Sequence, residues 1–184
     1  MLLQCKDKRK VAQIAMIVAI DRNGAIGKNG DQLIYISADL KHFKATTSGH
    51  TVVMGRKTSE ALPKGILPNR RNIIITRSQA WSRDGAEVAH SVAETINLTT
   101  ENEQIFVIGG GEIYKQFMPI ANKLFVTEID MEATNPDTFF PTIETSQWNK
   151  ISTSEWLVDE KTNIRFRFVE YVRYQTQRVT THNS

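Results

Sequence analysis

The chain has 184 residues, a length that suits one compact domain with short tails. Its 40% hydrophobic and 8% aromatic content is ordinary for a globular protein, and its formal net charge is only +3. A single cysteine, Cys5, excludes an intramolecular disulfide and a multi-cysteine metal site.

The predicted elements of the first part of the chain alternate between buried strands and helices. In chain order they are a strand over residues 11–20, a loop over 21–30, a helix over 37–44, a strand over 51–54, a short helix over 55–62 and a loop over 63–71. Unbroken apolar runs predict the strands, and clusters of Gly, Pro and Asn predict the loops. Ser37 is the expected helix cap, and Asp39 lies in the first turn.

The second part continues the alternation and then ends in consecutive strands. The elements are strands over 72–76 and 87–89, a helix over 92–98, a strand over 106–108, a helix over 112–118, a strand over 123–129, a loop through 135–137, and a hairpin of residues 150–156 and 164–174. Strands that alternate with short helices predict a mostly parallel sheet, and the closing strands predict an antiparallel edge. The predicted fold class is therefore α/β, in a single domain.

The basic excess lies largely at the two ends, including residues 6–10 near the N-terminus. Such charge runs fit either a solvated tail or a nucleic-acid-binding arm, and we favour the tail. The chain shows no apolar segment of signal-peptide or membrane-spanning length. We therefore expect a cytoplasmic protein with no membrane or nucleic-acid partner.

Three predicted strands end in sequences suited to a phosphorylated ligand. Residues 55–58 (GRKT) place two cations and a hydroxyl at a helix start. Thr76-Arg77 places a base where a site for an unphosphorylated dinucleotide would often hold an acid. Ligands collect outside the carboxyl ends of strands in open α/β sheets, so these sites together suggest NADPH. Taken singly, Arg56 and Arg77 also fit ordinary surface cations.

The third strand end is the triple glycine, residues 109–111, which follows the strand 106–108. Two interpretations are open: the glycines serve only the φ angles of a tight turn, or they let a ligand approach the backbone at a helix start. The standard GxGxxG fingerprint is absent.

Asp39 is the candidate acid. Leu40 and Phe43 follow it on the helix, so its side chain could point into an apolar cleft, or it could simply complement the helix dipole. The histidines form no pair with ligand spacing, so we expect no metal site; they are His42, His50, His90 and His182.

The order and spacing of nine segments resemble the dihydrofolate reductase family over residues 13–174. These segments are Ile17-Val18-Ala19, Ala25-Ile26-Gly27, residues 39–44, 53–58, 67–72 and 107–111, Tyr114, residues 127–130 and residues 137–141. The resemblance divides the chain into an N-terminal extension (1–12), the reductase domain (13–174) and a C-terminal tail (175–184). It also implies an eight-stranded, mostly parallel sheet flanked by about four helices.

The activity that the resemblance implies is reduction of 7,8-dihydrofolate to 5,6,7,8-tetrahydrofolate by NADPH, a reaction of one-carbon metabolism. Hydride goes to C6 of the substrate and a proton to N5. The resemblance further implies antifolate inhibitors as ligands and a monomeric enzyme.

Residue roles follow from the same resemblance. Asp39 is implied as the catalytic carboxylate that holds the pterin and promotes protonation at N5, with Thr127 supporting it. Arg70 is implied as a fork for the α-carboxylate of the substrate's glutamate tail. The other substrate-side positions are Ile17, Val18, Ile34, Phe43, Leu62, Leu67, Ile108 and Tyr114.

The implied cofactor positions form a second set. Ala19 and Ile26 would offer backbone groups to the nicotinamide carboxamide, and Gly109-Gly110 matches a cis peptide typical of the family. The full set is Ala19, Ile26, Gly27, Gln32, Gly55, Arg56, Lys57, Thr58, Thr76, Arg77, Ile108, Gly109, Gly110, Gly111, Glu112, Ile113 and Tyr114.

Four positions depart from the family pattern. Leu33 and Ile34 replace a usual Pro-Trp pair, Ser37 replaces a Pro, and Gln32 replaces a Met or Leu. The usual tryptophan helps hold a water beside the acid, and Ile34 cannot donate a hydrogen bond. Tyr35 could take over part of that role or point away. We therefore predict altered proton delivery and altered antifolate binding.

Two alternative functions remain open on the sequence. One is a reductase of the same fold that acts on a pyrimidine intermediate of riboflavin synthesis; Asp39 and Arg70 favour folate instead. The other is a non-catalytic nucleotide- or nucleic-acid-binding protein, which an assay of NADPH consumption would distinguish.

Overall fold

A computed structural model of the chain describes residues 12–174, so nearly all of the predicted N-terminal extension and the whole predicted tail lie outside it. The strands are β1 (Gln13–Ile20), β2 (Ala25–Lys28), β3 (Asp31–Gln32), β4 (Thr51–Gly55), β5 (Arg71–Ile75), β6 (Ala86–Ala89), β7 (Gln104–Val107), β8 (Lys123–Ile129), β9 (Thr138–Phe139), β10 (Trp148–Thr153), β11 (Leu157–Val158) and β12 (Arg165–Arg173). The helices of the described residues are α1 (Ser37–Thr47), α2 (Arg56–Ala61), α3 (Val92–Asn97) and α4 (Gly111–Phe117).

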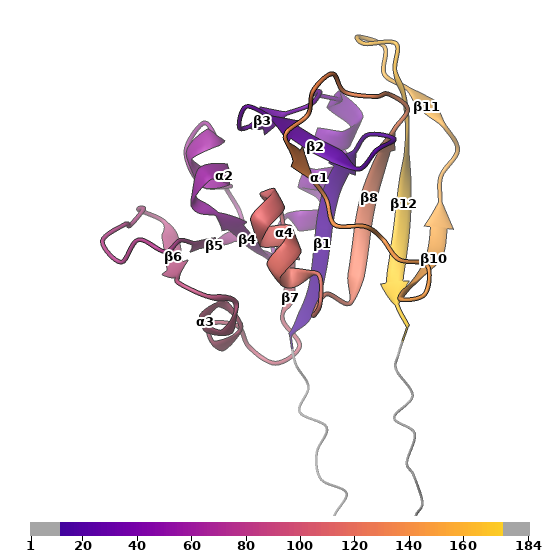
Figure 1. The fold of residues 1–184 in the computed structure, drawn as a ribbon. Helices are drawn as coiled ribbons and strands as arrows, with labels where there is room; N and C mark the ends of the chain where they lie inside the picture. The colour runs from indigo at the N-terminus through magenta and orange to yellow at the C-terminus, as the bar shows by residue number, and fades with distance from the viewer. Residues whose placement is uncertain (1–11, 175–184) are drawn as a thin grey trace, which may run out of the picture.

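One twisted sheet forms the centre of the molecule (Figure 1). Its strands follow the order β10-β12-β8-β1-β7-β4-β5-β6, and the short β11 pairs with β12 beside this path. The pairs from β8 through to β6 are parallel, whereas β12 is antiparallel to both β8 and β10. This topology confirms the predicted eight-stranded, mostly parallel sheet with an antiparallel C-terminal edge.

The predicted loop over residues 21–30 was partly wrong, because four of its residues form a strand. β2 pairs with β3 and with β9 in a small second sheet, which lies near the carboxyl end of β1 (Figure 1). The Asn and Gly residues that suggested a loop form the turns on either side, with positive φ at Gly24, Asn29 and Gly30. β9 lies about a hundred residues further along the chain, so a local pattern could not reveal this pairing.

Helix α1 extends beyond the predicted 37–44, and its predicted cap was wrong. Ser37 is the first helical residue rather than the cap, and Ile36 at the cap position offers no side-chain hydrogen bond. Asp159, in the turn after β11, accepts hydrogen bonds from the backbone N–H and the hydroxyl of Thr162. These bonds, and the nearby backbone N–H of Ser37, lower the pKa of Asp159. A carboxylate from a distant turn therefore lies at the start of α1, where the local serine was expected to act.

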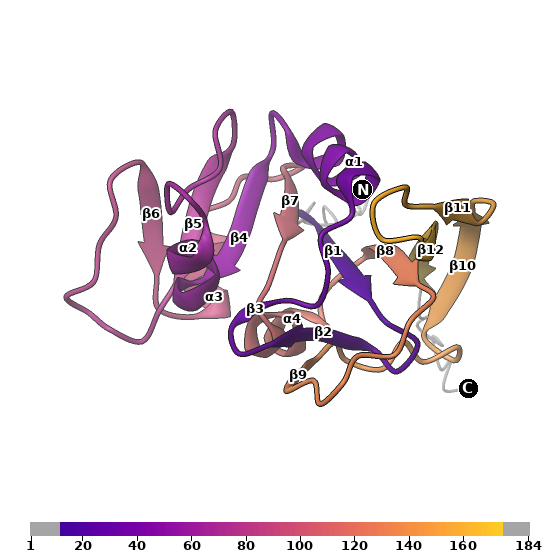
Figure 2. The ribbon, with the colours of Figure 1, turned by 90° about the horizontal axis from the view of Figure 1, so that it is seen from above.

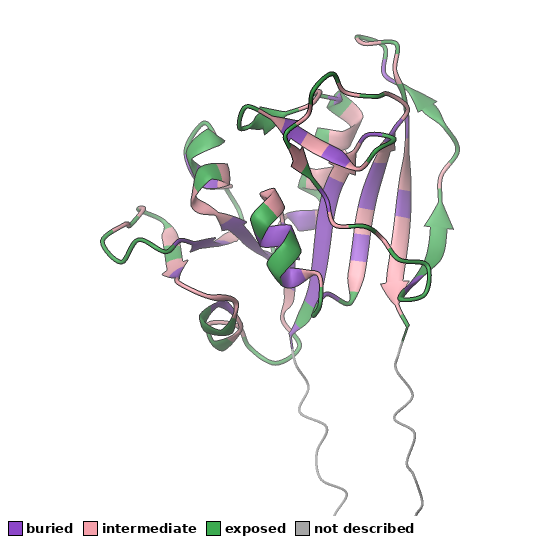
Figure 3. Ribbon diagram, viewed as in Figure 1, coloured by how far each residue is buried: buried purple, intermediate pink, exposed green. Residues whose placement is uncertain are grey.

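The two faces of the sheet bury different side chains, as strand alternation requires. Met16 and Val18 of β1 lie in the cluster covered by α3 and α4, and Ala15 and Ile17 lie in the cluster on the α1 side. Figure 2 shows α1 on one side of the sheet and α3 and α4 on the other. In Figure 3 the central strands are largely buried, while β10 and β11 at the edge are exposed.

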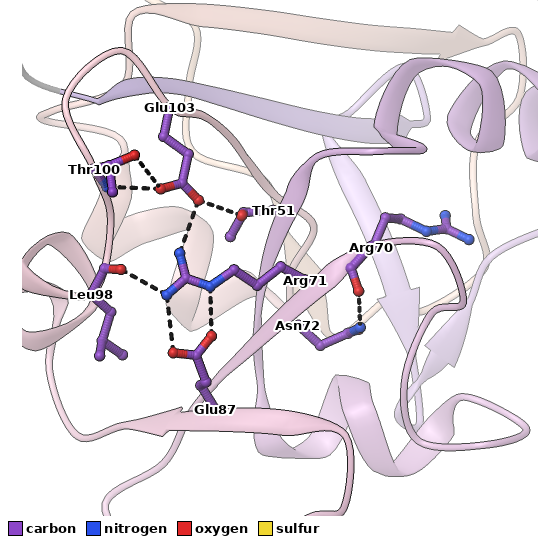
Figure 4. A network of polar contacts seen from close by, with 8 residues as sticks. All are labelled: Thr51, Arg70, Arg71, Asn72, Glu87, Leu98, Thr100 and Glu103. Carbon is purple, nitrogen blue, oxygen red and sulfur yellow. Dashed lines mark hydrogen bonds and ion pairs between the residues drawn. The ribbon is translucent and has the colours of Figure 1, made fainter.

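An ion-pair cluster ties β5 to its neighbours near the amino ends of the strands (Figure 4). The Arg71 guanidinium contacts Glu87 on β6 at 2.5 Å and Glu103 at 3.0 Å, and it donates to the Leu98 carbonyl at 2.7 Å. Glu103 also accepts from Thr51 of β4 at 2.5 Å. The carboxyl ends of the same strands carry the residues discussed next. None of the helices within residues 12–174 combines the length and the apolar character that crossing a bilayer requires.

Candidate active site

The sequence-predicted residues gather where the parallel strands end. β4 lies between β7 and β5, and Gly55 is in register with Ile75, so residues 56–58 and 76–77 leave neighbouring strands at one edge. The backbone N–H of Gly55 donates to the carbonyl of Gly109 at 2.8 Å, which joins the end of β4 to the triple glycine. Three segments far apart in the sequence therefore meet at one edge of the sheet.

Asp39 and Thr127 form the polar centre of the substrate side. Asp39 lies on the first turn of α1, and Thr127 is a buried residue of β8. The Thr127 hydroxyl donates to Oδ1 of Asp39 at 2.6 Å, across 88 residues of chain. The predicted partnership between the two side chains is present in the structure, although helix and strand propensity alone could not have paired them.

The environment of Asp39 favours the protonated acid. Burial raises the pKa of Asp39 above its ordinary value, while the hydrogen bond from Thr127 and the charge of His42 oppose that rise. A carboxyl group whose pKa lies above the ordinary range is suited to exchanging a proton with a bound molecule at mild pH.

An apolar cluster lies on the face of the sheet that α1 covers. Ile17 is buried there at 6% exposure. Four partly buried residues predicted for the substrate site pack against the same cluster: Phe43, Leu62, Leu67 and Ile108. The strand β1, the helix α1 and two loops thus supply one continuous apolar wall.

Val18 does not belong to that wall. Its side chain lies in the cluster on the opposite face of the sheet, because successive residues of β1 point to opposite sides. The Val18 side chain therefore faces away from that wall, and the assignment of Val18 to the substrate site stays a prediction. The sequence match covered three consecutive residues, and strand alternation separates their side chains.

Arg70 is held against α1 by three contacts. Its Nε donates to the Pro68 carbonyl at 2.9 Å, one terminal nitrogen donates to the Thr47 hydroxyl at 3.1 Å, and its guanidinium lies 6.0 Å from the Phe43 ring centroid. Its side chain points away from the Arg71 cluster (Figure 4). Burial lowers the pKa of Arg70, but an arginine remains charged. The guanidinium therefore presents a fixed positive charge beside the apolar wall.

Tyr114 connects the glycine turn to β1. Its hydroxyl donates to the Ile17 carbonyl at 2.6 Å, and its ring contacts Phe140 edge-on at 5.0 Å. A Cβ added to Gly109 would lie 3.4 Å from the Tyr114 ring, so the glycine backbone packs closely against the ring. Burial, followed by the charge of Asp39, raises the pKa of Tyr114, which keeps the phenol neutral.

The triple glycine forms a cradle that side chains would fill. The peptide between Gly109 and Gly110 is cis, as predicted from the family resemblance. A Cβ on Gly110 would lie 3.4 Å from the Thr58 hydroxyl, and one on Gly111 would lie 2.7 Å from Cγ2 of Thr138. The bare backbone of this turn and the adjacent α4 amino end fit an anionic group such as a pyrophosphate.

The cationic residues beside the cradle differ in how firmly they are held. Arg56 forms an exposed i,i+4 ion pair with Glu60 at 3.3 Å, and Lys57 and Arg77 are exposed. All three lie at the carboxyl ends of β4 and β5, where the predicted phosphate contacts were placed. A ligand with more than one phosphate could reach them from the glycine turn.

His90 is a polar residue of this edge that sequence reasoning missed. Its Nδ1 lies 2.8 Å from the carbonyl of Thr76, while the Thr76 hydroxyl accepts from the backbone N–H of Ser78. His90 follows β6, whose end is adjacent to the end of β5, so the strand-end rule applied to Thr76 would also have found it.

The segment before α1 settles where Ile34 and Tyr35 point. Ile34 packs with Ala19 and Ala38 in a third apolar cluster around Ile36. Tyr35 is 56% exposed, and its hydroxyl donates to Asp31 at 2.5 Å. Tyr35 therefore points away from the apolar wall and does not replace the tryptophan that the family pattern places at position 34.

The remaining predicted cofactor positions divide between backbone and side chain. Ile26 lies near Gly111, where its Cδ1 would be 3.9 Å from an added Cβ. Gly27 approaches the Asp31 carbonyl so closely that a Cβ would meet it at 2.9 Å, and Gln32 is exposed. Glu112 is exposed, whereas Ile113 is buried in the core and can offer a ligand only its backbone.

No group of three or more His, Cys, Asp or Glu side chains within residues 12–174 is arranged to hold a metal ion. The donors present are a carboxyl, a guanidinium, hydroxyls and backbone N–H groups, which fit an organic ligand with phosphates and a carboxylate.

Comparisons with known proteins identify the relatives of this chain. The family profile described as dihydrofolate reductase matches residues 13–173. Dihydrofolate reductase of Staphylococcus haemolyticus is 37% identical over 161 residues, which are 88% of this chain and 96% of that protein. Dihydrofolate reductase type 3 of Salmonella typhimurium is 40% identical over 162 residues, 87% of this chain and 98% of that protein.

A solved structure agrees with the sequence matches. Dihydrofolate reductase from Enterococcus faecalis, in complex with NADP(H) and RAB-propyl, superimposes with a TM-score of 0.81 at 36% identity. The match covers 89% of this chain and 97% of that one. Sequence and structure therefore point to the same relatives over nearly the whole described domain.

Proposed function

The chain belongs to the dihydrofolate reductase family, and we propose that the residues around Asp39 perform the chemistry of that family. Its activity is the NADPH-dependent reduction of 7,8-dihydrofolate to 5,6,7,8-tetrahydrofolate, an oxidoreductase reaction of folate metabolism. The observation that carries the proposal is the partly buried Asp39 carboxyl, paired with Thr127 at 2.6 Å beside the apolar wall of the α1 face.

We assign the pterin of the substrate to Asp39. The carboxylate accepts hydrogen bonds from the pterin amino group and ring nitrogen, and the Thr127 hydroxyl fixes the orientation of the carboxylate. Because burial raises its pKa, Asp39 can take up a proton near neutral pH and promote protonation at N5. The apolar residues around Ile17 and Phe43 exclude water from the ring and hold its plane.

Arg70 is assigned to the far end of the substrate. Its guanidinium is held by Pro68 and Thr47 next to Phe43, so the α-carboxylate of the glutamate tail can bind it as a fork. Asp39 and Arg70 thus hold the two polar ends of one molecule, and the apolar wall contacts the middle.

NADPH supplies a hydride when it is bound. The residues that would hold it are the backbone of Ala19 and Ile26 at the nicotinamide, the glycine turn at the pyrophosphate, and Thr58, Thr76 and Arg77 at the phosphates and ribose. The bare glycine backbone at the amino end of α4 supports the pyrophosphate position, and the close approach of Thr58 and Thr138 leaves no room for side chains there. Tyr114 orders the adjacent backbone through its bond to the Ile17 carbonyl.

The departures at positions 32–37 bear on proton delivery. Ile34 lies in an apolar cluster and Tyr35 bonds Asp31, so neither supplies a hydrogen-bond donor to Asp39. We propose that proton delivery in this chain relies on Asp39 and Thr127 without help from residue 34, and that antifolate binding differs accordingly.

We further propose that the enzyme acts as a cytoplasmic monomer with no nucleic-acid partner. The small net charge of +3 and the concentration of basic residues near the chain ends support this assignment. The family match favours folate over the pyrimidine alternative, and a non-catalytic binding role has no specific observation in its favour.

Asp39→Asn tests the assignment of the acid. We expect turnover at neutral pH to fall by about two orders of magnitude or more, because the amide cannot take up the proton. NADPH binding, measured by fluorescence titration, should stay largely intact, since Asp39 is assigned to the substrate and not to the cofactor. Asp84→Asn, on the exposed loop before β6, is the matched control and should behave as wild type. Near-normal turnover of the Asp39 variant would remove Asp39 from its role.

A further inference from the structure

His42 lies one helical turn after Asp39 and has no part in the assignments above. Residues three positions apart share a helix face, so its imidazole and the Asp39 carboxyl project from the same side of α1. The imidazole is half-buried and packs on Phe168 of β12, with the ring centroids 4.2 Å apart and the planes tilted by 33°. The ring is therefore held in place rather than free in solvent.

The sheet beneath α1 brings His42 and the Thr127–Asp39 pair together. Phe168 lies directly opposite Thr127 in the antiparallel pairing of β12 with β8. Thr127 donates to Asp39, and Phe168 supports His42. The carboxyl group thus has a hydroxyl from the sheet and an imidazole from its own helix as polar neighbours.

We propose that His42 is a positioning residue for the proton of Asp39. When the imidazole carries a proton, its positive charge favours the carboxylate form of Asp39. The importance of this pair for turnover rests on the catalytic role proposed above for Asp39, whereas the coupling itself does not.

The charged groups of the elements around α1 have partners of their own or are exposed. On the sheet face beneath α1, Lys123 pairs with Glu170 at 2.6 Å. On the opposite face of the same strands, Arg167 pairs with Glu128 at 2.6 Å. In the turn after β11, Asp159 accepts from Thr162, and Lys41 and Lys44 of α1 are exposed. Asp39 is the carboxyl group that shares a helix face with His42.

The size of the effect follows from the spacing on the helix. Cβ atoms three residues apart are about 6 Å apart, and two unit charges at that distance, at an effective dielectric constant of about 40 to 80, change an equilibrium by roughly three- to tenfold. The charge of His42 is also among the causes that oppose the rise in the pKa of Asp39 on burial.

The test is a direct titration of Asp39 in the whole, ligand-free protein. Carbon-13 NMR of labelled aspartate carboxyls follows the ionisation, and Asp39→Asn identifies the signal. In His42→Gln we expect the midpoint of the Asp39 titration to move to higher pH. At a pH on the acid side of that midpoint, the ratio of acid to carboxylate should rise roughly three- to tenfold.

Two further variants separate charge from packing. His42→Phe keeps an uncharged ring packed on Phe168. It should shift the Asp39 titration in the same direction as His42→Gln. If the glutamine variant does not fold, the phenylalanine variant provides the test. His50→Gln removes the imidazole that meets Phe106 edge-on at 5.4 Å, away from Asp39, and should leave the titration unchanged. An Asp39 titration that is the same in wild type and in the folded His42 variant would overturn the inference. Normal turnover of Asp39→Asn would instead overturn the proposed function and leave the coupling standing.

Discussion

Thr127→Val should destabilise the protein in a pH-dependent way. The change replaces the hydroxyl that donates to Asp39 at 2.6 Å with a methyl group of similar shape, at a site that is 3% exposed. A hydrogen bond to a charged group contributes about 1.5–3 kcal/mol, and one to a neutral group about 0.5–1.5 kcal/mol. The loss in the free energy of unfolding should therefore be about 1.5–3 kcal/mol where Asp39 is ionised, and about 1 kcal/mol less where it is protonated.

The sign follows from proton linkage. Burial raises the pKa of Asp39 in the folded state above its value in the unfolded state, so the folded state binds its proton more tightly. The protonation of Asp39 therefore adds to the free energy of unfolding at low pH, and this contribution is lost as the pH rises through the folded-state pKa. Removing the Thr127 donor raises the folded-state pKa of Asp39 further. The free energy of unfolding of the variant should therefore fall further below that of wild type at alkaline pH than at acid pH.

Urea unfolding at pH 4 and pH 8, followed by circular dichroism, measures the difference. With a urea m-value of about 2 kcal/mol/M, the transition midpoint at pH 8 should fall by roughly 1 M relative to wild type. Thr127→Ser keeps the hydroxyl and should show the same small loss at both pH values. A loss for Thr127→Val that is equal at pH 4 and pH 8 would refute the assignment of this hydrogen bond to the charged carboxylate.

Two further predictions concern the ligand ends of the site. Arg77→Ala should weaken NADPH much more than NADH in fluorescence titrations, because only NADPH carries the additional phosphate; equal losses would contradict the phosphate assignment. Arg70→Ala should raise KM for dihydrofolate about 10- to 100-fold with little change in kcat, as expected from the loss of charge-assisted hydrogen bonds to the substrate carboxylate. Arg70→Lys should recover only part of that loss, since lysine lacks the planar fork, and a KM unchanged in Arg70→Ala would place the carboxylate elsewhere.

Much of the fold could be predicted from local sequence patterns. The strand over residues 123–129 has the bounds of β8, and the helices predicted at 92–98 and 112–118 match α3 and α4 to within one residue at each end. These elements combine an apolar run or a helical repeat with clear turn residues at their ends, so a short window contains the necessary signal. The strand-end rule likewise located the segments that meet at the glycine turn.

The predictions that were wrong concern elements whose partners lie far away in the chain. β2 exists because residues 25–28 pair with β9, and the start of α1 has the Asp159 carboxyl of a distant turn near it instead of a local serine cap. Each of these outcomes is fixed by a contact or a direction that a local window of sequence does not contain.

The sequence by itself determined the class of fold, the strand ends that carry ligand-binding residues, and the family to which they point. Apolar periodicity and glycine placement suffice for the fold class and the strand ends, because backbone geometry and burial act over a few residues at a time. The family came from the resemblance in order and spacing of the nine matching segments. Only the tertiary structure decided that Thr127 bonds Asp39, that Tyr35 bonds Asp31 and leaves Ile34 among apolar side chains, and that His42 rests on Phe168. The protonation of a buried carboxyl depends on the groups within a few ångströms of it, and folding alone brings those groups together.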